Sequence, residues 1–388
     1  MAKTKANVKR AETSADNIMC LRPSYLEIDL DAFNDNFRKI KSAISSDSSI
    51  LAVVKANAYG HGLVRITLQA EKCGADMVGV AFVEEGEKLL EAGVKAPITV
   101  LYPDTVDRAS RLVKADLIAT VDSAEYLKAL NSAAVSMRKT VKVFLKAETG
   151  MARFGAGEAE IKELISLAGK MSAVEIIGIT TNLADSNNGD DSFTIEQYDK
   201  FTRIIESIGL RSNISYLSIE NSSGFLYHHN RNFNLVRVGL LLYGLSPKKD
   251  VRCEFTPVMS LKSKIIKLKE WPAGKPVGYS GSFVPDRDTV IATIGLGYAD
   301  GYPWSLSNKS YVLISGRRAS VIGKICMDAV MIDVTDIPGA KVGSEVVLLG
   351  RSGNENITVE ELTEMAGSFS YEFISGFSDR LPRIYKEK

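Results

Sequence analysis

The chain has 388 residues, of which 45% are apolar and 24% charged, and its formal net charge is +1. This length exceeds what one small core usually holds, so we expect one large domain and a smaller one. The composition is ordinary for a globular protein, and the balanced charge gives no reason to expect nucleic acid or a membrane surface as a partner. No apolar run has the length of a membrane span.

The four cysteines are scattered and contain no CxxC pair, which favours a reducing compartment. They are Cys20, Cys73, Cys253 and Cys326. The first 21 residues are polar and basic and lack the hydrophobic stretch of a secretory signal. We therefore predict a disordered leader over 1–21 and a cytoplasmic protein. The adjacent His228 and His229 have no third histidine nearby, so we expect no metal site.

Eight short apolar, β-branched runs alternate with helical patterns in the first two thirds of the chain. The predicted strands cover 50–55, 77–82, 98–102, 117–121, 141–147, 174–181, 214–219 and 235–238, and helical patterns cover 63–73, 84–91, 158–170 and 193–208. Apolar strands that alternate with helices indicate a parallel sheet covered by helices. Eight such units predict a (β/α)8 barrel of the TIM type. An open, doubly wound sheet is the alternative, because a count of units does not show closure.

After residue 256 the pattern changes to strands joined by turns. Strands are predicted over 258–270, 289–297, 311–321, 329–334 and 345–349, followed by a helix over 358–366 with Thr358 as its N-cap. We expect the barrel domain to cover 22–256 and a mostly β domain to cover 257–388. We leave open whether an opening strand near 24–30 joins the β domain.

Lys55 ends the first predicted strand, at the face where barrels of this type carry out chemistry. Its apolar approach favours the neutral amine, which is the form that bonds to a carbonyl carbon. A lysine that only caps the strand at the surface is the alternative. Polar residues or glycine follow later strands at the same face, namely Lys146, Arg153, Asn182, Asn221, Ser222, Arg237 and Gly239. This convergence indicates an active site, and barrels commonly bind phosphate at the last two strands.

Several motifs in one order resemble those of alanine racemases. The segment 54–62, VKANAYGHG, resembles the pyridoxal 5′-phosphate (PLP) signature of that family. Further matching segments are 22–32, 148–155, 221–222, 236–244, 278–279, 295–301 and 323–328. Tyr279 and Tyr298 also have the family's spacing of nineteen residues. The resemblance implies a PLP-dependent homodimer with shared active sites that interconverts L- and D-alanine and supplies D-alanine for cell-wall peptidoglycan.

The same resemblance implies a role for each matching residue. Lys55 would carry PLP as a Schiff base and act as one base, and Tyr279 of the other subunit would act as the second. Arg153 and the Met327 backbone would bind the substrate carboxylate. The cofactor would also contact Tyr59, Asn221, Ser222, Arg237, Gly239 and Leu240. Supporting positions would be Lys146, which is often carbamylated in this family, Tyr298, Cys326 and Asp328.

Two positions depart from the family pattern. Asn182 replaces a histidine beside the PLP ring, and Asp379 replaces a tyrosine near the phosphate. An aspartate there needs Arg380 or another cation to pair with it. Its short side chain also predicts a wider pocket, so a serine or broader racemase is an open alternative. The others are a barrel-type PLP decarboxylase, which needs no opposed tyrosine, and a PLP carrier protein, which has no β domain.

Overall fold

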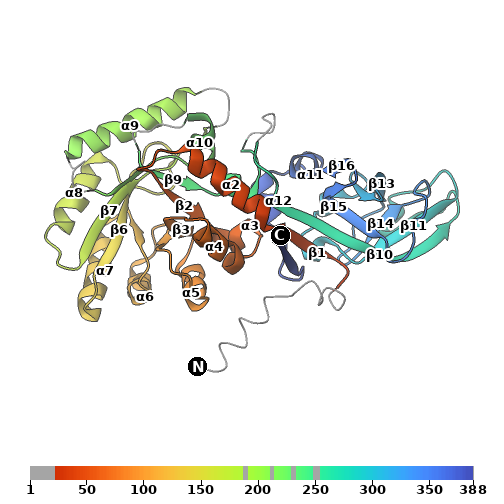
Figure 1. Cartoon of the computed structure of the whole chain (residues 1–388), viewed down its shortest axis with the longest axis horizontal. Coiled ribbons are helices and arrows are strands. Elements are labelled where there is room, and N and C mark those ends of the chain that lie inside the picture. Colours follow the sequence, from red (N-terminus) through yellow and green to blue (C-terminus); the bar gives the residue numbers. More distant parts are fainter. Residues whose placement is uncertain (1–21, 187–190, 210–213, 229–232, 248–253, 388) are drawn as a thin grey trace. The chain divides into compact units, whose positions relative to one another are not determined.

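The computed structural model describes residues 22–186, 191–209, 214–228, 233–247 and 254–387 (Figure 1). They form two compact units: Asn34–Phe255 makes one, and the residues up to Phe33 combine with Thr256–Lys388 to make the other. The predicted leader over 1–21, Cys20, His229 and Cys253 lie outside the described residues. None of the described helices combines the length and the apolar character that a membrane crossing requires.

The described residues of the unit Asn34–Phe255 include eight strands, and all their ladder pairings are parallel. They are β2 (Ser49–Val53), β3 (Met77–Val80), β4 (Ile98–Val100), β5 (Ala119–Val121), β6 (Val141–Lys146), β7 (Val174–Thr180), β8 (Tyr216–Ser218) and β9 (Leu235–Val238). Pairing runs in the orders β4-β3-β2-β9 and β5-β6-β7-β8. A bridge between Thr99 and Ile118 joins β4 to β5, and Arg237 N donates to Glu220 O at 3.1 Å where β9 follows β8. The ring is therefore closed, which confirms the predicted barrel over the open sheet.

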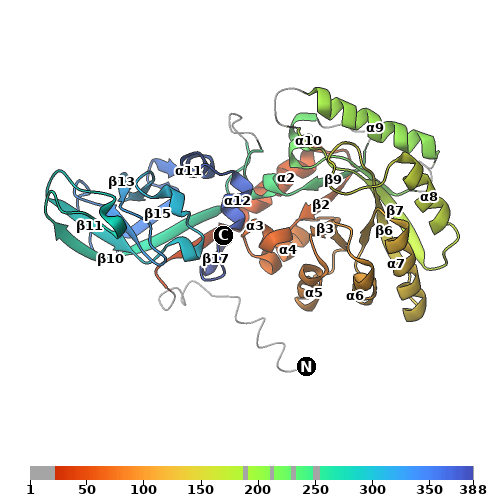
Figure 2. The ribbon, with the colours of Figure 1, turned by 180° about the vertical axis from the view of Figure 1, so that it is seen from behind.

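Helices cover the outside of this ring, as the two opposite views show (Figures 1 and 2). They are α2 (Leu30–Ala43), α4 (Leu63–Lys72), α5 (Val83–Glu91), α6 (Ala109–Lys114), α7 (Ala124–Met137), α8 (Glu158–Ala168), α9 (Ser192–Ile208) and α10 (Ser222–His228). The short segment α3 (Lys55–Tyr59) instead directly follows the carboxyl end of β2. Each longer helix turns an apolar stripe inward; α7, for example, buries Leu127 and Leu130. Because helices cover one face of the strands and barrel side chains the other, strand residues such as Ile50 and Ala52 are fully buried.

The other unit is built on one nine-stranded sheet. Its strands are β1 (Tyr25–Asp29), β10 (Met259–Trp271), β11 (Thr289–Ile294), β12 (Tyr311–Ile314), β13 (Arg317–Ile322), β14 (Val330–Asp333), β15 (Glu345–Ser352), β16 (Glu355–Ile357) and β17 (Arg383–Lys386). A second pairing of β15 with β10 closes six of these strands into a small ring. The opening strand β1 pairs with β10 and β17 and so belongs to this unit.

Sequence patterns located most strands of this unit but missed one turn. The predicted strand over 311–321 is a hairpin, because Ser315 and Gly316 have φ values of 51° and 74° and reverse the chain between β12 and β13. The strands β16 and β17 and the short helix α12 (Ser370–Ser375) were also not predicted. Before α11 (Val359–Ala366), Thr358 Oγ1 accepts a hydrogen bond from Glu361 N at 3.2 Å, which confirms the predicted N-cap.

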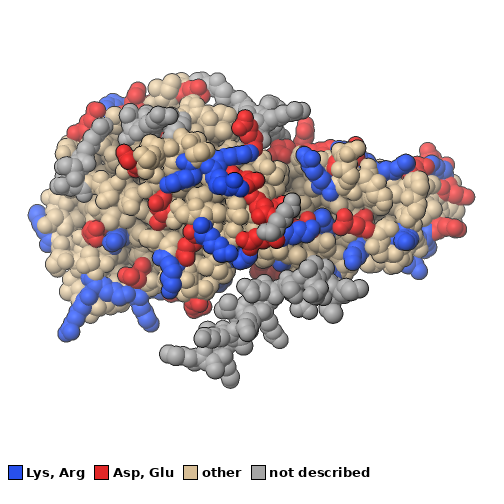
Figure 3. All heavy atoms as spheres, viewed as in Figure 1, with Lys and Arg blue, Asp and Glu red and all other residues tan. Residues whose placement is uncertain are grey.

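On the face of the molecule drawn in Figure 3, basic and acidic side chains are interspersed. Neither sign gathers into an extended field there, as the near-zero net charge leads us to expect.

Two glycines of the barrel unit give a matched test of its packing. A methyl group at Gly178 in β7 would clash with the Phe144 ring and lie 2.7 Å from Tyr216 O on the neighbouring strand. At Gly169, which ends α8 in a right-handed conformation, the nearest atom would lie 3.5 Å away. We expect Gly178→Ala to lower the free energy of unfolding by about 1–3 kcal/mol, and Gly169→Ala to leave it unchanged or raise it by up to about 1 kcal/mol. Urea titrations followed by circular dichroism measure both; equal midpoints for the two variants would contradict the packing described.

Candidate active site

The carboxyl ends of the barrel strands meet at one rim, and polar residues from several strands lie together there. Lys55 follows β2, Tyr102 follows β4, Lys146 ends β6, and Arg237 lies in β9. Parallel strands closed into a ring place these residues side by side although they are far apart in the sequence.

The backbone directly after Lys55 turns in the left-handed sense. Ala56, Asn57 and Ala58 have φ values of 51°, 56° and 53°. A residue other than glycine adopts this conformation at a cost of about 1–2 kcal/mol, so surrounding contacts must hold the turn. Asn57 Oδ1 accepts a hydrogen bond from Leu63 N at 2.8 Å, which fixes the turn to the start of α4.

Glu85 is the second group that holds this turn. Its Oε1 accepts from Ala56 N at 2.7 Å, and its Oε2 accepts from Ala81 N at 2.8 Å. One carboxylate thus connects the residue after Lys55 to the end of the strand β3. Sequence reasoning missed Glu85, because an acidic residue in the first turn of a helix is ordinary.

Tyr102 lies between Lys55 and Arg153. Its hydroxyl accepts a hydrogen bond from Lys55 Nζ at 2.8 Å, and Arg153 Cζ lies 5.3 Å from the centre of its ring. Burial acts to raise the pKa of Tyr102, but the hydrogen bond from Lys55 and the two neighbouring cations lower it below its ordinary value. Sequence reasoning gave Tyr102 no role, although it ended a predicted strand at the same rim.

Arg237 and Asn182 meet deeper in the barrel. Arg237 Nη1 donates to Ser218 Oγ, and its Nη2 donates to Thr181 O at 2.7 Å and to Asn182 Oδ1 at 3.2 Å. Burial lowers the pKa of Arg237 to about 10, which still leaves the guanidinium charged at neutral pH. Asn182 therefore supports the position of this cation.

Tyr59, Ser222 and Gly239 form a narrow cradle at the ends of the last strands. Gly239 N donates to Ser222 Oγ at 3.0 Å, and a methyl group at Gly239 would lie 2.7 Å from the Tyr59 hydroxyl. Asn221 Oδ1 accepts from Gly224 N at 2.9 Å and so caps α10. The buried Ser223 hydroxyl has no hydrogen-bond partner among the described residues. Hydroxyl and backbone donors in this arrangement suit an anion such as phosphate. Leu240 is buried directly beside the cradle.

Lys146 is buried beside the two arginines. Burial, and then the charges of Arg237 and Arg153, lower the pKa of Lys146 well below its usual value. Lys146, Arg153 and Asn182 line one small cavity. Burial and the two arginines therefore act in the same direction, against the protonated form of this amine.

The remaining predicted residues lie in the other unit. Tyr298 N donates to Cys326 O at 3.1 Å, and Ala299 N donates to Met327 O at 3.1 Å, so these two segments are docked on each other. Burial raises the pKa of the Cys326 thiol. Tyr279 is 69% exposed and Met327 is 52% exposed.

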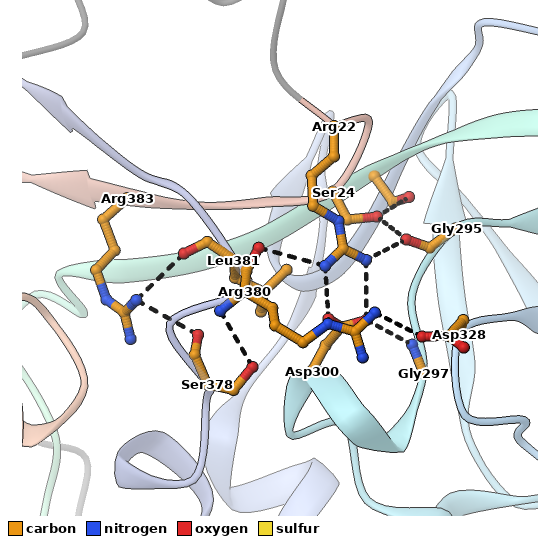
Figure 4. A network of polar contacts seen from close by, with 11 residues as sticks. Arg22, Ser24, Gly295, Gly297, Asp300, Asp328, Ser378, Arg380, Leu381 and Arg383 are labelled. Atoms are coloured by element: carbon orange, nitrogen blue, oxygen red, sulfur yellow. Dashed lines mark hydrogen bonds and ion pairs between the residues drawn. The ribbon is translucent and has the colours of Figure 1, made fainter. Parts of the chain in front are cut away.

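A buried carboxylate holds these two segments in place (Figure 4). Asp300 accepts from Arg22 Nη1 at 2.6 Å and Nη2 at 2.9 Å, and from Gly297 N at 3.0 Å. Arg380 lies on the same carboxylate and donates from Nη2 to Asp328 Oδ1 at 2.5 Å. One network therefore fixes the segment of Tyr298 against the segment of Met327.

Comparison with known proteins identifies the family. Two family descriptions, "Alanine racemase, N-terminal domain" and "Alanine racemase, C-terminal domain", match residues 28–247 and 258–385. The alanine racemase of Halothermothrix orenii is 39% identical over 370 residues, which cover 95% of this chain and 98% of that protein. The chain belongs to the alanine racemase family.

Solved racemase structures have the same fold as this racemase. The alanine racemase of Clostridium difficile 630 is 31% identical, with a TM-score of 0.89 over 94% of this chain and 96% of that chain. That of Bartonella henselae, described with covalently bound pyridoxal phosphate, is 27% identical, with a TM-score of 0.84 over 94% and 99% of the two chains. This chain is therefore an amino-acid racemase, an isomerase. Because the match to alanine racemases covers both domains, it excludes the two alternative classes, a PLP decarboxylase and a PLP carrier protein.

Of the two departures from the family pattern, Asp379 lies at the surface of this racemase. Its side chain is 92% exposed, and its Oδ1 lies 3.4 Å from Arg383 Nη1. Arg383 is thus the cation beside it, whereas Arg380 contacts Asp300 and Asp328.

The role of Glu85 in holding the left-handed turn can be tested by substituting two adjacent glutamates. Glu85→Gln converts one acceptor oxygen into a donor, so Ala56 N or Ala81 N loses its partner. We expect the free energy of unfolding of the racemase to fall by about 1–3 kcal/mol. Glu84 makes only partly exposed ion pairs with Arg108 and Arg111, and Glu84→Gln should cost less than about 1 kcal/mol. Guanidinium titrations compare the two variants. If Glu84→Gln lowers the free energy of unfolding as much as Glu85→Gln does, the special role of Glu85 is refuted.

Proposed function

We propose that this racemase interconverts L- and D-alanine with PLP held at Lys55, using Lys55 and Tyr279 of a second copy as two opposed bases. The observation that carries the proposal is the Lys55 amine at the barrel rim, within one cluster with Arg153 and in the same unit as the anion cradle. We further propose that the D-alanine product supplies cell-wall peptidoglycan.

The donor set of the barrel fits PLP. Lys55 supplies the amine that would hold it covalently, and the cradle of Tyr59, Ser222 and Gly239 would receive its phosphate, next to Asn221 and Leu240. The close approach of the Tyr59 hydroxyl to the backbone of Gly239 leaves no room for a side chain there. Arg237 would face the ring nitrogen as a donor. When bound, PLP withdraws electrons from the substrate α-carbon and so makes the α-proton more acidic.

The chain's own residues would position the substrate and move the proton. Arg153 would bind the substrate carboxylate through charge-assisted hydrogen bonds, together with the Met327 backbone N–H. Lys55 Nζ would take or return the α-proton on one face, and the Tyr279 hydroxyl would do so on the other. Arg237 keeps its proton at neutral pH, and burial beside Arg237 and Arg153 disfavours a further positive charge on Lys146.

The exposure of Tyr279 supports a shared site in a homodimer. Tyr279 is 69% exposed and Met327 of the same unit is 52% exposed, so both leave apolar surface uncovered in the single chain. We propose that a second copy covers this surface and that each copy's Tyr279 completes the site of the other.

Loss of the Lys55 amine should abolish cofactor attachment. We expect the protein with added PLP to show an absorbance band at about 420 nm, and Lys55→Ala to lose both the band and racemisation of either enantiomer. Lys162→Ala is the control, because Lys162 makes only an exposed ion pair with Glu158. Wild type, and not Lys55→Ala, should also support growth of a bacterium that requires D-alanine. No band in the wild type would refute PLP binding at this site.

Mixed dimers test the shared site. Lys55→Ala and Tyr279→Phe should each be nearly inactive alone. After the two variants are unfolded together and refolded, half of the dimers are mixed, and each holds one intact site. Activity should therefore return to about a quarter of the wild-type value. No recovery would mean that Lys55 and Tyr279 of the same chain, or neither pair, form the site.

A further inference from the structure

The proposed function gives no role to Tyr102, although this residue lies in one cluster with Lys55 and Arg153. It follows β4 by two residues, and its hydroxyl accepts from Lys55 Nζ at 2.8 Å. Its ring centre lies 4.9 Å from Lys55 Nζ and 5.3 Å from Arg153 Cζ. One aromatic side chain therefore contacts both the proposed base and the proposed carboxylate-binding group.

We propose that Tyr102 is a positioning residue that orients the Lys55 amine through its hydroxyl and the Arg153 guanidinium through its ring. This inference rests on the proposed function, because it assumes that Lys55 moves the α-proton and that Arg153 binds the substrate carboxylate.

The Tyr102 ring is itself held in place. The Phe154 ring lies 5.2 Å from it, and the Phe82 ring packs edge-on at 6.4 Å, centre to centre. Glu85 meanwhile fixes the backbone at Ala56, next to Lys55. The lysine is thus anchored at its backbone by one residue and at its amine by another.

Proton transfer by Lys55 requires that its amine be held at one position, which the hydrogen bond to Tyr102 would do. A lysine amine that takes or returns a proton must be free, and a free four-carbon side chain has many rotamers to lose. A hydroxyl already within hydrogen-bonding distance limits this freedom and keeps Nζ at one point. The Tyr102 hydroxyl accepts from Lys55 Nζ at 2.8 Å, and this hydrogen bond is charge-assisted when the amine is protonated. A guanidinium over the same ring gains a cation–π contact, so the base and the carboxylate-binding group share one support.

Two variants separate the roles of the hydroxyl and the ring. Tyr102→Phe removes only the hydroxyl, so kcat should fall about tenfold, the effect of one hydrogen bond to a charged group, while KM stays within about twofold. The loss of α-proton exchange should be confined to one enantiomer, the one deprotonated by Lys55. Tyr102→Leu also removes the ring, and KM should then rise about tenfold as Arg153 loses its support.

The apo-protein gives a readout that does not depend on turnover. Added PLP should form the band at about 420 nm roughly tenfold more slowly in Tyr102→Phe than in wild type, because the amine is less well placed. Tyr126→Phe is the matched control, since the buried Tyr126 hydroxyl has no partner among the described residues, and it should behave as wild type.

Equal rates of band formation and unchanged kcat in Tyr102→Phe would overturn the role of the hydroxyl, and an unchanged KM in Tyr102→Leu would overturn the role of the ring. Equal loss of exchange from both enantiomers would also count against a contact specific to Lys55. A wild-type protein without the band would instead refute the proposed function, so the two failures are distinct.

Discussion

Closure of eight parallel strands is the constraint on which the site depends. All carboxyl ends of a parallel ring lie at one rim, so residues that follow β2, β4, β6 and β9 become neighbours although up to 182 positions separate Lys55 from Arg237. The bridge between Thr99 and Ile118, and the contacts between β8 and β9, complete that ring. Closure also covers the strand edges that an open sheet would expose: just before β9, for example, Asn234 N donates to Leu217 O of β8 at 3.2 Å.

A place at the rim does not by itself orient the Lys55 side chain. The local backbone conformation also contributes to its orientation. The left-handed run after Lys55 is unfavourable for alanine and asparagine, and it persists because Glu85 and Asn57 bind its N–H groups or its neighbours. These contacts hold the backbone directly after Lys55. The hydrogen bond to Tyr102 then fixes the other end of the side chain. The Lys55 side chain is thus held at both ends, by the backbone contacts next to it and by the Tyr102 hydroxyl at Nζ.

In the β unit, a network of ion pairs around Asp300 holds the loop segments in place. Asp300 is completely buried and receives both nitrogens of the Arg22 fork, an arrangement that compensates the desolvation of the charges. The residues it joins are 278 positions apart. Through Arg380 the same network reaches Asp328, which directly follows Met327 in the chain (Figure 4).

The sequence by itself determined the eight strand–helix units, the change to a β unit, Lys55 at a strand end, and the family, because alternation and short ordered motifs are local properties of the chain. Only the tertiary structure decided ring closure, the place of β1, the hairpin at Ser315 and Gly316, and the partners of Tyr102, Glu85 and Asp300. Those partners lie far apart in the chain, and a single tyrosine or glutamate carries no local pattern that names its contact.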